Sequence, residues 1–218
     1  MASFEIMAGE GMHWVKATLH GDSLRAESGA LSYIEGDVAV EAPLPSFKQL
    51  LAAVLAEEAL IRPRYQGTGE VFLEAGLGNF HVVELDDEEM ILEAGSYWAS
   101  DGDIELSAYR EPAWTSLWTG EGLLKFRTKV RGTGKVVVRV PGPVEEVRLS
   151  DGTYRTESKI VVGRSSNLKY TVRRPTRSIF GYMLAGEGFL KSFEGSGRLL
   201  VCYTPYWMLR LQEMIRRD

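Results

Sequence analysis

Three glutamates recur at nearly constant spacing along the chain and are the first candidates for chemistry. Glu27, Glu93 and Glu157 are separated by 66 and 64 residues. If a pseudo-threefold axis brings them together, three carboxylates at one point require a bound cation or protons to offset their charge. The simpler interpretation is that each accepts backbone hydrogen bonds where a strand meets a turn. The pattern therefore predicts strand ends, with a metal site at the three glutamates as the alternative hypothesis.

The remaining metal ligands and nucleophiles form no recognised constellation. The histidines, His13, His20 and His81, make no His-x-His or His-x-x-x-His pair, although His13 and His81 take similar places beside Gly-x-Gly turns. The one cysteine, Cys202, lies in an apolar run, and no Gly-x-Ser-x-Gly elbow is present. The acidic run at residues 86–89 lacks the spacing of a calcium loop and is predicted to be a solvated turn. We expect no catalytic residue, no cofactor and no enzymatic activity.

A basic segment near the C-terminus is the candidate nucleic-acid site. Lys169, Arg173, Arg174 and Arg177 surround Tyr170, so the segment can follow a phosphate backbone while an aromatic ring stacks on a base. No recognised RNA-binding motif accompanies it. The alternative is a basic edge strand that faces the acidic half of another subunit.

Charge is divided unequally between the two halves of the chain. Residues 1–122 hold six Lys/Arg and 22 Asp/Glu, a net charge of −16, whereas residues 123–218 hold 19 and eight, a net charge of +11. Such an asymmetry favours pairing of opposite surfaces, within one chain or between subunits. We therefore expect a homo-oligomer, such as a trimer.

An internal repeat organises the chain. Three segments align without gaps and share Leu, Glu and Ala or Ser at the same offsets: Leu19–Gly29, Leu85–Gly95 and Leu149–Lys159. Recurrence at this period indicates a repeat architecture. Gly-Thr-Gly or Gly-Ser-Gly precedes a short β-prone run in phase with each segment, at 67–69, 132–134 and 195–197. These glycines are predicted at hairpin ends, where they permit a positive φ.

The repeat predicts an all-β single domain over residues 1–218 in which three β units stack with pseudo-threefold symmetry, as a double-stranded β-helix or a β-sandwich. The expected units and closing strand are about 4–68, 69–133, 134–197 and 198–203. Two short helices interrupt the pattern: one follows Pro45 and begins with a capping box at Ser46, and the other covers residues 205–217 after Thr204. We expect the second helix to dock on the β units or on a neighbouring subunit, with contact to a membrane surface as the alternative.

Features of the chain termini and of the apolar segments predict a cytoplasmic protein. The N-terminus lacks the basic flank and apolar core of a signal peptide, and no apolar run approaches the length of a membrane span. A single cysteine allows no intramolecular disulfide, which fits a reducing compartment.

Several of these stretches together resemble one protein family. Phe4-Glu5-Ile6, the stretch Leu19–Leu31 and the later Gly-Glu-Gly and Gly-Thr-Gly turns are similar to the "altered inheritance of mitochondria" family of bacteria and archaea, which is named for a yeast mitochondrial member. The resemblance covers nearly the whole chain. It implies a fold like that of the tryptophan RNA-binding attenuation protein, with three such units per chain.

The resemblance implies no site residue, because the family has no established catalytic residues, and RNA binding does not follow from architecture. The chain departs from the family pattern at the helix from Ser46 and at Lys159, where the first two units have glycine. Three functions stay open at this point. They are a self-associating scaffold or interaction module, an RNA-binding module that uses the basic C-terminal third, and a small-molecule binder that uses a β-barrel interior.

Overall fold

The computed structural model describes residues 1–42, 62–76, 78–110, 126–157, 160–173 and 190–203. These residues form an antiparallel sheet of twelve strands, which confirms the predicted all-β class. The two expected helices, from Ser46 and over residues 205–217, lie outside the described residues. The strands are β1 (Ser3–Gly9), β2 (Met12–Ala26), β3 (Leu31–Glu41), β4 (Arg64–Gly76), β5 (Asn79–Leu92), β6 (Tyr97–Asp101), β7 (Glu105–Arg110), β8 (Phe126–Val140), β9 (Val144–Glu157), β10 (Val161–Ser165), β11 (Lys169–Arg173) and β12 (Leu190–Cys202).

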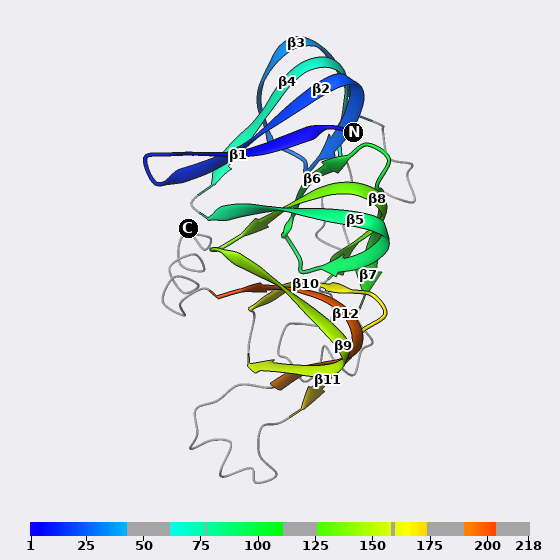
Figure 1. The fold of residues 1–218 in the computed structure, drawn as a ribbon. Coiled ribbons are helices and arrows are strands. Elements are labelled where there is room, and N and C mark those ends of the chain that lie inside the picture. Colours follow the sequence, from blue (N-terminus) through cyan, green and yellow to red (C-terminus); the bar gives the residue numbers. More distant parts are fainter. Residues whose placement is uncertain (43–61, 77, 111–125, 158–159, 174–189, 204–218) are drawn as a thin grey trace.

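The strands fall into three groups that lie one below another in Figure 1: β1–β4, β5–β8 and β9–β12. Each group is built on one long antiparallel pair, β2 with β4, β5 with β8, and β9 with β12. The expected unit boundaries at 68/69 and 133/134 fall within β4 and β8, and residues 198–202 form the second half of β12. No helix in the described part of the chain is long and apolar enough to cross a membrane.

The three long pairs share one register, in which a leucine of the first strand faces a glycine of the second: Leu19 with Gly69, Leu85 with Gly134, and Leu149 with Gly197. A register shift accompanies each of these leucines. Because a bulge adds a residue to one strand, it bends that strand and increases its twist. The repeated segments of the sequence therefore mark the points where the long pairs bend.

Hydroxyl groups between the paired glycines hold the bulges in the second and third groups. Asp87 and Asp151 have φ angles of 49° and 50°, a conformation that aspartate tolerates better than most residues. The Asp87 amide donates to Thr133 Oγ1 at 3.0 Å, and the Asp151 amide donates to Ser196 Oγ at 2.9 Å. The Thr or Ser of each glycine motif thus satisfies a backbone donor that the bulge removes from the ladder.

Short central strands join the groups through main-chain hydrogen bonds. β6 pairs with β8 of its own group and with β2 of the first group. β10 likewise pairs with β12 and with β5 of the second group. All five residues of β6 and all five of β10 are buried. At each junction the sheet therefore continues through main-chain pairing, and the groups do not merely pack side chain against side chain.

The apolar core follows the same plan, because its clusters cross the junctions. Trp98, Ala99 and Val137 of the second group pack in the cluster built around β2 and β4. Val162 and Leu200 of the third group pack in the cluster of the second. Neighbouring groups therefore share parts of their apolar cores.

The glycine motifs lie inside long strands and not at the predicted hairpin ends. Another strand crosses the first motif closely. Gly67 lies within β4 at φ +146°, and a Cβ built on it falls 2.1 Å from the Asp37 carbonyl oxygen of β3. Its counterpart Gly132 in β8 has φ +129°, and the nearest atom to its Cβ position is Ile104 Cδ1 at 3.6 Å. Gly67 is thus required by both conformation and space, whereas Gly132 is required by conformation.

This difference predicts unequal effects of the same substitution. Gly132→Ala is expected to lower the free energy of unfolding by about 1–3 kcal/mol through backbone strain. Gly67→Ala is expected to cost a further 1–3 kcal/mol or so, because β3 must move away from the added methyl group. Urea denaturation of the two variants measures the difference. Equal losses would show that β3 does not approach β4 as closely as described.

Candidate functional site

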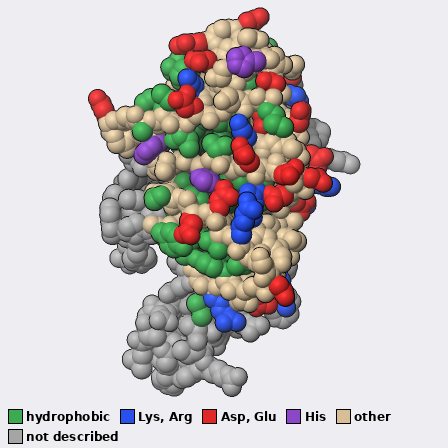
Figure 2. Space-filling view, viewed as in Figure 1, with side chains coloured by type: hydrophobic (Ala, Val, Ile, Leu, Met, Phe, Trp, Pro, Cys, Tyr) green, Lys and Arg blue, Asp and Glu red, His purple; other side chains and the backbone are tan. Residues whose placement is uncertain are grey.

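A polar groove crosses the face where the second and third groups meet. Its volume is about 720 Å³, and β5, β8, β9 and β12 contribute its charged side chains. Figure 2 shows acidic and basic side chains side by side in the middle of this face. The acidic members are Glu84, Asp86, Glu88 and Glu146.

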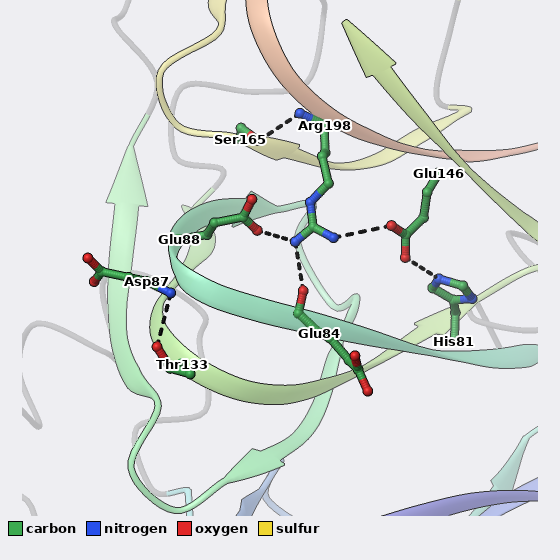
Figure 3. Close-up of polar contacts among 8 residues, drawn as sticks. All are labelled: His81, Glu84, Asp87, Glu88, Thr133, Glu146, Ser165 and Arg198. Carbon is green, nitrogen blue, oxygen red and sulfur yellow. Dashed lines mark hydrogen bonds and ion pairs between the residues drawn. The ribbon is translucent and has the colours of Figure 1, made fainter.

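Arg198 of β12 is the central charge of the groove (Figure 3). Its side chain is only 11% exposed. Nη1 donates to Glu146 Oε2 at 3.2 Å, and Nη2 donates to the Glu84 carbonyl oxygen at 2.8 Å and to the Glu88 carboxylate. The Arg198 backbone amide donates to Ser165 Oγ at 2.8 Å, which fixes the start of the side chain. Two carboxylates therefore compensate one nearly buried guanidinium, as burial of a charge requires.

His81 extends this network to the rim of the groove. Its Nε2 lies 3.1 Å from Glu146 Oε1, so Glu146 contacts β5 through His81 and β12 through Arg198. Within the described residues, β5 pairs with β8 and β10, and β9 pairs with β12 alone. The Glu146 carboxylate therefore links β5 and β9, two strands that share no main-chain ladder.

The groove offers limited chemistry. An imidazole beside a carboxylate is the arrangement that orients a general base, but the residues that line the groove include no hydroxyl or thiol. Across the described part of the chain, no cluster of three or more His, Cys, Asp or Glu side chains is placed to hold a metal ion. The arrangement joins the second and third groups through the ion pairs of Arg198.

Removal of the central charge is expected to destabilise the protein. Arg198→Met leaves two carboxylates without their cation, and we expect the free energy of unfolding to fall by about 3 kcal/mol. Arg148→Met is the matched control, because Arg148 is an exposed residue of the same groove and should change stability by less than about 0.5 kcal/mol. Urea denaturation at neutral pH measures both. Similar losses in the two variants would contradict a stabilising role for the ion pairs of Arg198.

Glu89 of β5 forms an ion pair within the second group and a hydrogen bond to the third group. Its carboxylate lies 3.1 Å from Lys129 Nζ, and its backbone carbonyl accepts a hydrogen bond from the Ser166 amide at 3.0 Å. Burial alone raises the pKa of Glu89, but hydrogen bonds from Ser166 and Lys129 outweigh burial and hold the pKa below its ordinary value of 4.5. The charged form is thus favoured in the folded state.

A lowered pKa in the folded state makes stability depend on pH in one direction. The contribution of Glu89 is fully present above its unfolded pKa and is lost as the pH falls through its folded pKa. We expect the wild type to exceed Glu89→Gln by about 0.5–1 kcal/mol at pH 7, as for a partly exposed pair, and this difference to vanish in strong acid. Unfolding free energies of both proteins from pH 7 downward test it. A difference that does not change with pH would contradict the assignment.

The repeated glutamates do not meet at one point. The Glu27 amide donates to the Trp98 carbonyl oxygen at 2.8 Å, and Arg62 Nε donates to the Glu27 carboxylate at 3.3 Å. Glu93 lies at the next junction, where its carboxylate accepts a hydrogen bond from Arg127 Nε at 3.0 Å. The Glu93 amide donates to the Val162 carbonyl oxygen at 2.9 Å. Glu27 and Glu93 therefore cross two successive junctions through their backbone amides, and each carboxylate binds an arginine of its own group. The side chain of Glu157, at the end of β9, lies outside the described residues.

Only the start of the predicted basic site lies within the described residues. Lys169 begins β11, is 70% exposed in its side chain, and has its Nζ 4.0 Å from Glu194 Oε2. Arg173 ends β11, and its side chain is outside the described part. Arg174 and Arg177 lie outside it altogether.

The prediction that His13 and His81 occupy similar positions in successive units is wrong. The offset that relates Leu19 to Leu85 makes Val15 the counterpart of His81, since Val15 faces Leu73 and His81 faces Val138. The ring of His13 instead contacts the Gly78 carbonyl oxygen, with Nδ1 at 3.0 Å. The Gly-x-Gly turns misled the alignment because β2 begins seven residues before Leu19, whereas β5 begins six residues before Leu85.

The acidic run at residues 86–89 is not a solvated turn. β5 continues through it with a bulge at Asp87, and Glu88 and Glu89 reach Arg198 and Lys129. Glu88 and Arg198 are thus site residues that sequence reasoning missed. The sequence does show that Arg198 occupies a repeated basic position, since it directly follows the third glycine motif as Lys135 follows the second.

The first group has a strand edge at the place where the other groups are joined. Ile34 of β3 faces Val71, as Ser100 of β6 faces Val136 and Arg164 of β10 faces Leu199. β6 and β10 are wholly buried, but Tyr33 and Glu35 of β3 are exposed and Ile34 is half-buried. Tyr33 is 49% exposed, with its ring stacked on Phe72 at a centroid distance of 4.2 Å. Among the described strands, β3 pairs with β4 alone.

Comparisons with known proteins give a family and a fold. The chain is similar to the protein SPYM3_0169 from Streptococcus pyogenes, whose crystal structure matches with a TM-score of 0.71 and 20% sequence identity over 100% of this chain and 99% of that one. Curated proteins give no match. The model of the family described as mitochondrial biogenesis AIM24 matches residues 4–202. This match spans nearly all of the three strand groups, and the chain therefore belongs to the AIM24 family.

Proposed function

We propose that this chain is a non-enzymatic module that associates with copies of itself through the open edge of β3. The proposal treats the three strand groups as copies of one β unit stacked end to end. One observation carries it. The stretch that is wholly buried between two strands in β6 and β10 has as its equivalent in β3 the exposed Tyr33 and Glu35, with half-buried Ile34 between them.

An open strand edge has a physical consequence. It presents a row of backbone donors and acceptors that can template a further strand, and proteins protect such edges unless they use them. Tyr33 and Val40 leave apolar surface on this strand, each 49% exposed. A partner strand on β3 would bury Tyr33 and complete the ladder, as β2 does for β6.

The charge distribution supports association between unlike ends. β3 carries Glu35, Asp37 and Glu41 and no basic residue, and it belongs to the half of the chain with net charge −16. The other half has net charge +11. Opposite fields of this kind steer encounter and fix orientation more than they add affinity, and salt weakens them.

We place this module in the cytoplasm. The support is the cysteine content of the sequence, which has Cys202 alone and so allows no disulfide within the chain. A chain that does not use intramolecular disulfides suits a reducing compartment.

Substitution at the open edge is expected to weaken association. A lysine in an edge strand opposes pairing with another strand, so Tyr33→Lys should raise the dissociation constant about tenfold or more, a change of about 1.4 kcal/mol. Sedimentation velocity over a range of protein concentrations, at low and at high salt, measures it. The wild type should assemble at low salt and dissociate partly at high salt.

Val40→Lys is the matched control for this experiment. Val40 lies on the same strand and has the same exposed fraction as Tyr33, but its counterpart Leu106 lies in β7, which pairs with β8 alone among the described strands. Val40→Lys should therefore leave association unchanged. A wild type that stays monomeric at both salt concentrations, or equal effects of the two lysines, would refute the proposed function.

A further inference from the structure

We infer that the strand received by β3 is β9 of a second copy, so that the third group of one chain continues into the first group of the next. This inference rests on the proposed function and names its partner. Its basis is the pair of junctions inside the chain, which supply both the surfaces and the register.

The internal junctions use one register. Leu24, Arg25 and Ala26 of β2 face Asp101, Ser100 and Ala99 of β6. Met90, Ile91 and Leu92 of β5 face Ser165, Arg164 and Gly163 of β10. In both junctions the donated stretch is the end of the first strand of a long pair, and the receiving stretch is the short strand of the following group.

The same positions can be located on the two ends of the chain. The donated stretches begin opposite Tyr65 in the first group and opposite Val130 in the second, and the residue at this position in the third group is Tyr154, opposite Phe193. On the receiving side, Ile34 corresponds to Ser100 and Arg164. A junction between two copies therefore sets Tyr154 against Glu35 and Arg155 against Ile34.

The overall charge of the two ends suits such a pairing. Arg155 and Glu35 are both exposed, but successive side chains of a strand point to opposite faces, so Arg155 shares a face with Ile34 and the register itself forms no Arg155–Glu35 ion pair. The complementarity lies in the longer-range field, because β3 belongs to the acidic half of the chain and β9 to the basic half.

The inference also sets the symmetry of the assembly. β3 and β9 are different surfaces, so the contact is head-to-tail and the assembly is a closed ring or a filament. Pairing of two β3 edges would give a twofold dimer instead. The two arrangements bring different residues together.

Disulfide cross-linking between copies separates these arrangements. One copy carries Ile34→Cys and an affinity tag, the other carries Arg155→Cys, and native Cys202 stays buried in both. Residues directly opposite in an antiparallel pair have Cα atoms about 4.5–5.5 Å apart, within the range of a disulfide. Mild oxidation of the mixture should give a tagged heterodimer, and neither variant alone should cross-link.

Thr153→Cys is the matched control for the register. Thr153 is also exposed on β9 but lies two residues from the position that faces Ile34, which separates the Cα atoms by about 7–8 Å. It should cross-link with Ile34→Cys at least about tenfold less than Arg155→Cys does, because disulfide geometry does not reach that far without backbone movement.

The outcomes distinguish the inference from the function on which it rests. Cross-linking of Ile34→Cys with itself, or equal cross-linking at 153 and 155, in a sample that sedimentation shows to be assembled, would overturn the β9 partner and leave self-association standing. A sample that is monomeric by sedimentation would overturn both. A heterodimer that forms through residue 155 alone supports the head-to-tail contact.

Discussion

The requirement that backbone donors and acceptors be paired at strand edges governs this fold. A long antiparallel pair such as β2 and β4 cannot bury both of its faces and edges alone. β6 and β10 meet the requirement because each pairs on both edges, once within its group and once with the group before it. Burial of all their residues follows from that position. The sheet therefore continues across each junction through the same main-chain pairing that holds each group together.

Much of this plan could be predicted from the sequence because it is local and periodic. The glycine motifs, the leucines and the strand-forming runs recur at the repeat period, and they correspond to the bulges and the buried central positions of the long pairs. The sequence did not reveal that the glycine motifs lie inside bent strands, or that β3 crosses the first of them. A positive φ has the same sequence signal at a hairpin end and inside a bent strand, so Gly67 was assigned to the wrong kind of site.

The charged groove could not be predicted, because its members are far apart in the chain. Arg198 contacts Glu88, 110 residues away, and Glu146, 52 residues away. An acidic run resembles a solvated turn until a cation from another strand reaches it. Likewise, equal spacing of Glu27 and Glu93 suggested convergence, whereas in a stack equal spacing places equivalent residues at successive junctions. Periodicity shows that positions are equivalent, but it does not determine whether they meet.

A stack of units joined by main-chain pairing has ends, and its ends differ from each other. The first group keeps a receiving edge at Tyr33–Glu35, and the third group keeps the stretch at Tyr154–Arg155 that corresponds to the donated strands of the others. Hydrogen bonds between strands carry little sequence information, so an edge of this kind accepts many strands. In the proposed assembly, charge supplies the missing selectivity, since unlike fields at the two ends favour one orientation and oppose contact between like ends. The proposal thus accounts for the acidic first half and the basic second half of the chain together with the open edge of β3.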